Sequence, residues 1–157
     1  MTNATTVGAS WAQFAAEAPE LAAAVRRCFA VRKHCTLATL RADGSPRISG
    51  TEVQLDDEHF GLGSMPGAVK ARDLQRDGRC AVHSPTVDPP EGAEESWAGE
   101  AKVSGTAEEV GAVPGHPADS HAFRLSLTEV VLTCVADGQL EITSWHPGRG
   151  VQVHRRS

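Results

Sequence analysis

The 157-residue sequence has few aromatic side chains: three Trp, four Phe and no Tyr, together 4% of the chain. A surface that stacks the bases of single-stranded nucleic acid needs several aromatic rings, so such a surface is not expected here. Acidic residues outnumber basic ones by 20 to 15, and the formal net charge is -5. We therefore expect no general attraction to DNA or to an anionic membrane, and any bound anion must be held by a local basic cluster.

Long hydrophobic runs are also lacking. No apolar stretch approaches the ~20 residues that span a bilayer, and the first ten residues lack the basic and apolar regions of a secretion signal. None of the four cysteines forms a C-x-x-C pair, and three lie inside apolar runs, which favours buried free thiols. None of the seven histidines has H-x-x-x-H spacing, so no metal site is predicted. These features predict a cytoplasmic protein without a membrane partner.

Two helices are predicted near the start of the chain, over about residues 10–31. Ser10 followed by Gln13 has the spacing of a capping box, and the alanine-rich stretch that follows favours helix. Pro19 suits the first turn of a second helix, in which apolar residues recur every three or four positions. This pair of helices is expected to pack against the rest of the domain.

From residue 34 onward the sequence consists mainly of short apolar and β-branched segments separated by turn signals. Strands are predicted at about 35–40, 46–55, 59–63, 79–84, 97–110, 126–135 and 139–145, one further helix at about 67–76, and loops at 84–96 and 111–120. Closure of many short antiparallel strands removes unpaired edges, which favours a barrel. The sequence thus predicts one domain, 1–157, mainly β with flanking helices and with a barrel over about 34–149.

A first candidate for anion binding lies in the second predicted strand. Arg47, Ser49 and Thr51 alternate onto one face of this strand, while Ile48 and Gly50 fall on the other. A guanidinium presents a planar fork of donors that suits phosphate, and hydroxyl groups can donate to the remaining oxygens. A phosphate monoester is a natural ligand for this face. The alternative is a polar strand side that faces solvent.

A second candidate follows the third predicted strand. The small-residue turn 62–67 opens directly into the helix that carries Lys70 and Arg72. A helix start offers free backbone N–H groups and the positive end of the helix dipole, and the Ser64 hydroxyl lies beside them. The alternative is an amphipathic helix whose basic side chains merely face water. Two such elements separated by one strand are stronger evidence for an anion site than either alone.

From His34 to about Arg149 the chain resembles the pyridoxamine 5′-phosphate oxidase-like, FMN-binding split barrels. The resemblance rests on the order and spacing of several segments, namely 35–40, 43–47, 62–64, 70–74, 78–82, 105–108 and 123–130. It implies a six-stranded Greek-key barrel that forms a homodimer, with two flavin sites in the grooves between the subunits. The cofactor carries the hydride chemistry in such proteins, so no catalytic side chain is identified.

The resemblance also assigns residues to the cofactor. In the family, the Arg of the second strand and the Lys of the K-x-R-D-L helix bind the flavin phosphate, and these correspond to Arg47 and Lys70. The neighbouring residues that would line the isoalloxazine ring and the ribityl chain are Ile48, Ser49, Gly63 and Ser64.

Two departures from true pyridoxamine phosphate oxidases argue against vitamin B6 oxidation. Val69 stands where those enzymes have an Arg before the motif Lys, and their substrate-binding Arg and His set near the C-terminus is replaced by the segment 145–150. The expected function is therefore an FMN- or deazaflavin-dependent oxidoreductase that transfers a hydride to a small organic substrate. The alternative is a non-catalytic flavin, deazaflavin or haem carrier. Trp97 and Trp145 are expected in core or dimer packing, or as an aromatic wall beside the flavin. The tail with Arg149, His154, Arg155 and Arg156 is expected to be a solvated end, and the alternative is that Arg149 reaches the cofactor of a neighbouring subunit.

Overall fold

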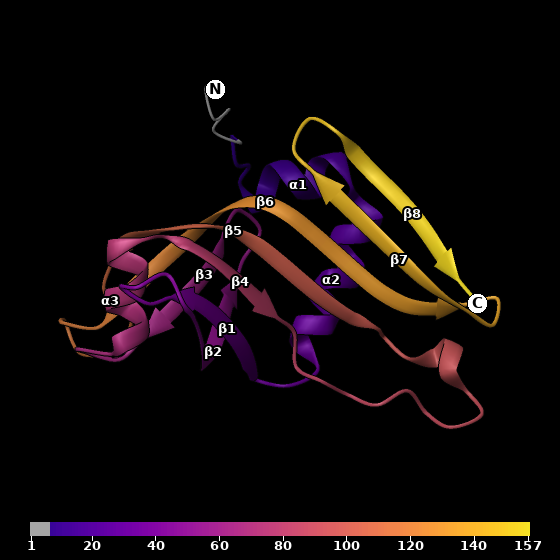
Figure 1. Ribbon diagram of the computed structural model, residues 1–157, viewed down its shortest axis with the longest axis horizontal. Coiled ribbons are helices and arrows are strands. Elements are labelled where there is room, and N and C mark those ends of the chain that lie inside the picture. Colours follow the sequence, from indigo (N-terminus) through magenta and orange to yellow (C-terminus); the bar gives the residue numbers. More distant parts are fainter. Residues whose placement is uncertain (1–6) are drawn as a thin grey trace.

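The computed structural model describes residues 7–157 (Figure 1). Its helices are α1 (Trp11–Glu17), α2 (Pro19–Ala30), α3 (Val69–Arg76) and the short 3-10 helix η1 (Glu94–Ser96). Its strands are β1 (His34–Leu40), β2 (Pro46–Leu55), β3 (Phe60–Ser64), β4 (Arg79–His83), β5 (Glu100–Gly111), β6 (His121–Ala136), β7 (Gln139–His146) and β8 (Gly150–Arg156).

Six strands form a closed antiparallel barrel in the order β3-β2-β1-β4-β5-β6, because β3 also pairs with β6. The predicted split-barrel fold is confirmed. β6 is long enough, at 16 residues, to close the barrel with its first part and to pair with β7 through its second part. The hairpin of β7 and β8 therefore extends away from the barrel, as Figure 1 shows.

The two N-terminal helices close one side of the barrel through a cluster of aromatic rings. The capping box of α1 is present, with the Ser10 hydroxyl accepting from the backbone N–H of Gln13. Phe14 of α1 packs against Trp145 of β7, with ring centroids 4.8 Å apart. Trp145 is completely buried, and its indole N–H donates to Glu17. Trp145 thus belongs to the core, and its interpretation as an aromatic wall beside a cofactor is wrong.

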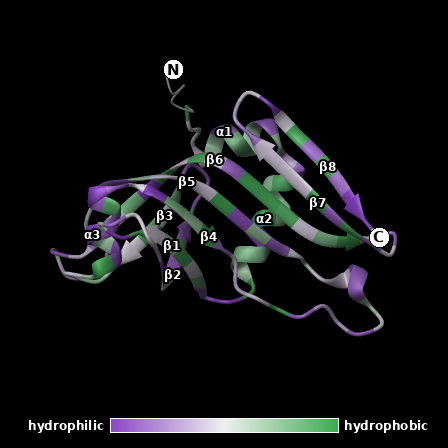
Figure 2. Ribbon diagram, viewed as in Figure 1, coloured by the Kyte–Doolittle hydropathy of each residue, from purple (hydrophilic) through white to green (hydrophobic). Residues whose placement is uncertain are grey.

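The tail after Arg149 is solvent-exposed as expected, but it forms strand β8, which was not predicted from the sequence. The reason is local: the turn after β7 contains Pro147 and Gly148, and Val151 and Val153 then alternate with polar residues, a pattern typical of a strand. Figure 2 shows this alternation as changes of colour along β8. The side chains of β8 nevertheless remain mostly exposed, because the strand forms the free edge of the sheet.

Candidate cofactor cleft

Helix α3 packs against β1 and β5 and is joined to β2 by two side-chain hydrogen bonds. The Lys70 ammonium donates to the backbone carbonyl of Gly50 at 2.6 Å, and the Arg47 guanidinium Nε donates to Asp73 Oδ2 at 2.7 Å. The helix forms because its residues favour helix and because Ala71 and Leu74 are buried on one face. One turn of the helix separates Lys70 from Asp73, so both contacts arise from the same side of α3.

A cleft of about 350 Å³ lies where β2, β3, the start of α3 and the loop 111–120 meet. This volume is within the range of small-molecule sites. Its lining consists of His34, Gly50, Thr51, Glu52, Gln54, Gly63, Ser64, Met65, Lys70, Val113 and His116. The cleft therefore combines one lysine, one carboxylate and two imidazoles with small and amide side chains.

The loop 111–120 forms one wall of this cleft. Val113 is buried, and its backbone N–H donates to the buried hydroxyl of Ser120, which holds the loop in place. A Cβ atom on Gly63 would lie 3.2 Å from the Val113 side chain, tighter than an ordinary contact. Glycine at position 63 therefore lets β3 and the loop approach closely.

Lys70 is half-buried at the cleft. Burial lowers the pKa of its ammonium from the ordinary value of 10.5, while the nearby Glu52 carboxylate opposes this shift. An ammonium group has three N–H donors, and the carbonyl of Gly50 takes one of them. The others are available to an anion.

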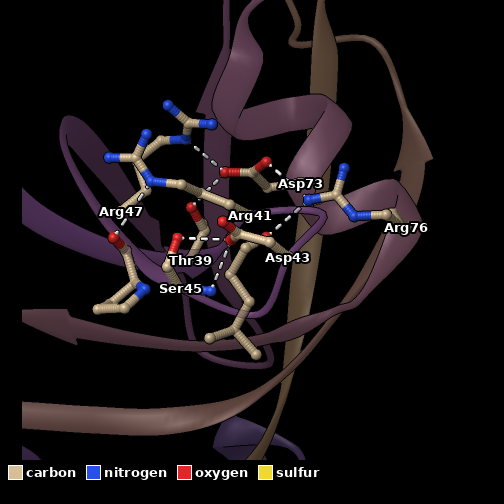
Figure 3. A network of polar contacts seen from close by, with 9 residues as sticks. Thr39, Arg41, Asp43, Ser45, Arg47, Asp73 and Arg76 are labelled. Atoms are coloured by element: carbon tan, nitrogen blue, oxygen red, sulfur yellow. Dashed lines mark hydrogen bonds and ion pairs between the residues drawn. The ribbon is translucent and has the colours of Figure 1, made fainter.

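Asp73 is a buried carboxylate that receives three side-chain donors, as Figure 3 shows. Thr39, Arg47 and Arg76 donate to it at 2.8, 2.7 and 2.9 Å. Burial would raise the pKa of Asp73, but these three hydrogen bonds outweigh it and lower the pKa to about 2. Asp73 thus links β1, β2 and α3 and fixes the orientation of Arg47.

The predicted site residues divide into two groups. Gly63, Ser64 and Lys70 line the cleft together. Arg47, Ser49 and Thr51 share one face of β2, as the alternation predicted, but they are not a polar side that faces solvent. They lie opposite Thr39, Leu37 and Cys35 of β1, of which all three are buried, so this face of β2 points inward. Ile48 projects from the other face and is 74% exposed.

Sequence reasoning missed several residues of the cleft. Glu52 and Gln54 continue the outward face of β2 beyond Ile48 and Gly50, and this alternation was the signal that could have found them. His34 lies directly opposite Glu52 in the pairing of β1 with β2. His116 and Val113 come from a loop about 50 residues further along the chain, and no local pattern indicates their position.

The sequence profile described as pyridoxamine 5′-phosphate oxidase matches residues 21–134, which is most of the chain. The chain belongs to this family. The match includes β1, β2, β3 and α3, which build most of the cleft. No curated protein sequence matches the chain.

Solved structures with the same fold are distant in sequence. A pyridoxamine 5′-phosphate oxidase-related, FMN-binding protein from Nostoc punctiforme is 10% identical, with a TM-score of 0.62 over 88% of this chain and 95% of that one. A protein described as an F420 reductase is 17% identical, with a TM-score of 0.51 over 67% and 94%. A haem-binding protein from Mycobacterium smegmatis is 16% identical, with a TM-score of 0.52 over 85% and 87%. The same fold thus occurs in proteins whose names mention FMN, F420 and haem.

Two further observations concern the described residues. Within residues 7–157, no group of three or more His, Cys, Asp or Glu side chains is arranged to hold a metal ion. The helices in that range are all too short or too polar to cross a membrane.

Proposed function

We propose that the cleft binds FMN or a deazaflavin cofactor and that the protein is an oxidoreductase, which transfers a hydride to a small organic substrate. The observation that carries this proposal is the position of Lys70. Its ammonium lies half-buried beside Gly63 and Ser64, in a chain of the pyridoxamine 5′-phosphate oxidase family. A charge-assisted bond from this ammonium suits a cofactor phosphate.

The residues of the cleft fit such a cofactor. Lys70 and the Ser64 hydroxyl would hold the phosphate, and glycine at position 63 leaves room for the cofactor chain. Arg47 does not line the cleft, but its side chain is 24% exposed and its two terminal nitrogens form no hydrogen bond with residues 7–157, so we propose it as a second ligand of the phosphate. Ile48 and Ser49 also lie outside the cleft lining, on opposite faces of β2, and would contact the ring and its chain from different sides of the strand. The bound cofactor would supply the hydride.

A second candidate is a non-catalytic carrier of flavin, deazaflavin or haem on the same barrel. Two imidazoles, those of His34 and His116, line the cleft. Histidine is a common axial ligand of haem iron, so this pair specifically favours haem among the carrier possibilities. Reduction of bound cofactor by a nicotinamide donor, followed by reoxidation with a small organic acceptor, would distinguish the oxidoreductase from the carrier.

Titration of the apo-protein identifies the cofactor. We expect FMN to bind more tightly than riboflavin, by a margin that shrinks as salt rises, because the overall charge of -5 leaves only the local basic residues to attract the phosphate. Fluorescence titrations with FMN, riboflavin, the deazaflavin coenzyme and haem at 20 mM and about 500 mM salt measure this. Equal affinities for FMN and riboflavin at low salt would show that Lys70 does not bind the cofactor phosphate.

We also propose a homodimer with the cofactor at the subunit interface. The outward face of β2 and the start of α3 expose apolar side chains beside the cleft: Ile48 is 74% exposed, Met65 77% and Val69 51%. A second subunit would cover them and add a wall to the cleft, with a buried area above ~1,000 Å².

Light scattering at micromolar concentration should give the mass of a dimer. Ile48→Lys should weaken the dimer, whereas Val153→Lys should not, because Val153 is an exposed apolar residue (54%) on β8, away from the cleft. A monomer that still binds cofactor contradicts this prediction.

A further inference from the structure

Glu52 places a carboxylate on the wall of the cleft. It lies on the outward face of β2, directly opposite His34, and its side chain is 48% exposed. Apart from its two histidines, the described lining of the cleft has two ionisable side chains, Lys70 and Glu52. The cleft therefore contains one fixed cation and one fixed anion.

These two charges have different partners available. Lys70 already donates to Gly50 and would be matched by a cofactor phosphate. Glu52 is 3.4 Å from the ammonium of Lys33 and 3.9 Å from the imidazole of His34, but these side chains are 74% and 79% exposed, and exposed ion pairs contribute little because solvent screens them. A phosphate monoester carries about −1.5 to −2 charge at pH 7, more than the single charge of Lys70 compensates, so Glu52 adds to a net negative charge in the cleft once such a cofactor is bound.

We propose that Glu52 is the specificity-determining residue of this cleft: it favours neutral or cationic small molecules and disfavours carboxylates and phosphate esters as substrates. This inference rests on the proposed function, because it assumes that a substrate shares the cleft with the cofactor. It follows from the sign of the potential at the cleft wall, since a low-dielectric concave surface concentrates the field of its charges.

The charge of the cleft can be measured without any cofactor. Met65 lines the cleft and is 77% exposed, so Met65→Cys places a reactive thiol there. Its rates of modification by an anionic reagent (sulfonatoethyl methanethiosulfonate) and a cationic one (trimethylammonioethyl methanethiosulfonate) are compared as a ratio. Both reagents react with the same thiolate, so a change in the pKa of the thiol alters both rates equally and cancels in the ratio. Background from the four native cysteines is small, because Cys28 and Cys35 are buried, burial raises the pKa of half-buried Cys80 to about 12, and burial also raises the pKa of half-buried Cys134.

In the Met65→Cys background, Glu52→Gln should lower the cation-to-anion rate ratio about fourfold at low salt. A unit charge about 8 Å away in water changes the local concentration of a monovalent ion about twofold, and the two reagents respond in opposite directions. The change should nearly vanish in 1 M salt. Lys33→Gln should raise the ratio, because it removes a neighbouring positive charge. Glu91→Gln, an exposed glutamate outside the cleft lining, is the matched control and should leave the ratio unchanged.

A ratio that changes no more in Glu52→Gln than in Glu91→Gln overturns the inference. A second measurement uses the loaded protein: quenching of the bound cofactor's fluorescence by iodide, relative to neutral acrylamide, should increase about twofold in Glu52→Gln. If the ratio of quenching by iodide to quenching by acrylamide is unchanged in Glu52→Gln, then Glu52 does not face the part of the cleft that a substrate would occupy. A different result would count against the proposed function alone. In that case the modification ratio of the thiol introduced by Met65→Cys changes in Glu52→Gln, but the protein binds neither flavin nor deazaflavin.

Discussion

Replacement of Asp73 by alanine is expected to destabilise the folded protein by about 3–5 kcal/mol, the usual effect of removing one partner from a buried ion pair. The side chain of Asp73 is only 2% exposed, and its loss leaves Arg47, 24% exposed, without its counter-ion. Such a loss is a large fraction of the 5–15 kcal/mol that is typical of a domain. Urea unfolding followed by circular dichroism measures it. The matched control is Asp77→Ala, which also removes an arginine partner at 2.7 Å but near the surface, and should change stability little.

The same carboxylate predicts a pH dependence. The pKa of Asp73 is about 2 in the folded protein and 3.8 ordinarily, so its contribution to stability is complete above about pH 4 and is lost as the pH falls toward 2. The contribution is on the order of 2 kcal/mol. The difference in urea midpoint between wild type and Asp73→Asn should therefore shrink between pH 4 and pH 2. A difference that stays constant over this range would show that charge at Asp73 does not stabilise the fold.

Lys70→Ala is expected to reduce the affinity for FMN by roughly ten- to a hundredfold. A hydrogen bond to a charged partner contributes ~1.5–3 kcal/mol, and each 1.4 kcal/mol corresponds to about tenfold in affinity. Riboflavin lacks the phosphate, so its affinity should change little. Arg72→Ala is the matched control, because Arg72 is exposed on the same helix and does not line the cleft. Equal losses for FMN and riboflavin would show that Lys70 shapes the cleft and does not bind phosphate.

Arg47→Ala should affect the melting temperature of the apo-protein more than Lys70→Ala does. Considered from sequence alone, both substitutions should weaken FMN binding with little effect on the melting temperature of the apo-protein. In the structure, Arg47 donates to the buried carboxylate of Asp73, so its removal takes away one of the two arginine partners of that carboxylate and leaves Arg76 and Thr39 alone to compensate the buried charge. Arg47→Ala should therefore lower the melting temperature of the apo-protein clearly, unlike Lys70→Ala, and differential scanning calorimetry of both variants compares them.

The barrel was predictable from sequence because its signals are local. Alternation, turn residues and helix formers placed β1, β2, β3, α3 and β4 within a few residues, and the order of motifs supplied their arrangement. The face of β2 that points inward was not predictable in the same way. Alternation separates Arg47 from Ile48, but only pairing with the buried side chains of β1 decides that the arginine face is the inner one.

The candidate site was predictable only in part, for a related reason. Gly63, Ser64 and Lys70 are close in sequence and fall within one motif. Glu52 and His34 meet through strand pairing, and His116 reaches the cleft through a loop that follows β5. Asp73 lies within the K-x-R-D-L helix, yet its function as the anchor of Arg47 depends on the packing of α3 against β1 and β5, which brings Asp73 to β2. Contacts made across the fold carry no signature in a single sequence.

The wall that the loop 111–120 provides has an evolutionary consequence. The strands on both sides of the loop, β5 and β6, pair with each other over most of their length, so the loop is an excursion from an intact hairpin. Doubling the length of such a loop costs only about 0.6 kcal/mol of closure entropy. Insertions and deletions there would reshape the mouth of the cleft while leaving Lys70 and the barrel in place. A single scaffold of this kind can therefore diversify its small-molecule repertoire through one short stretch of chain, without rebuilding the part that holds the cofactor.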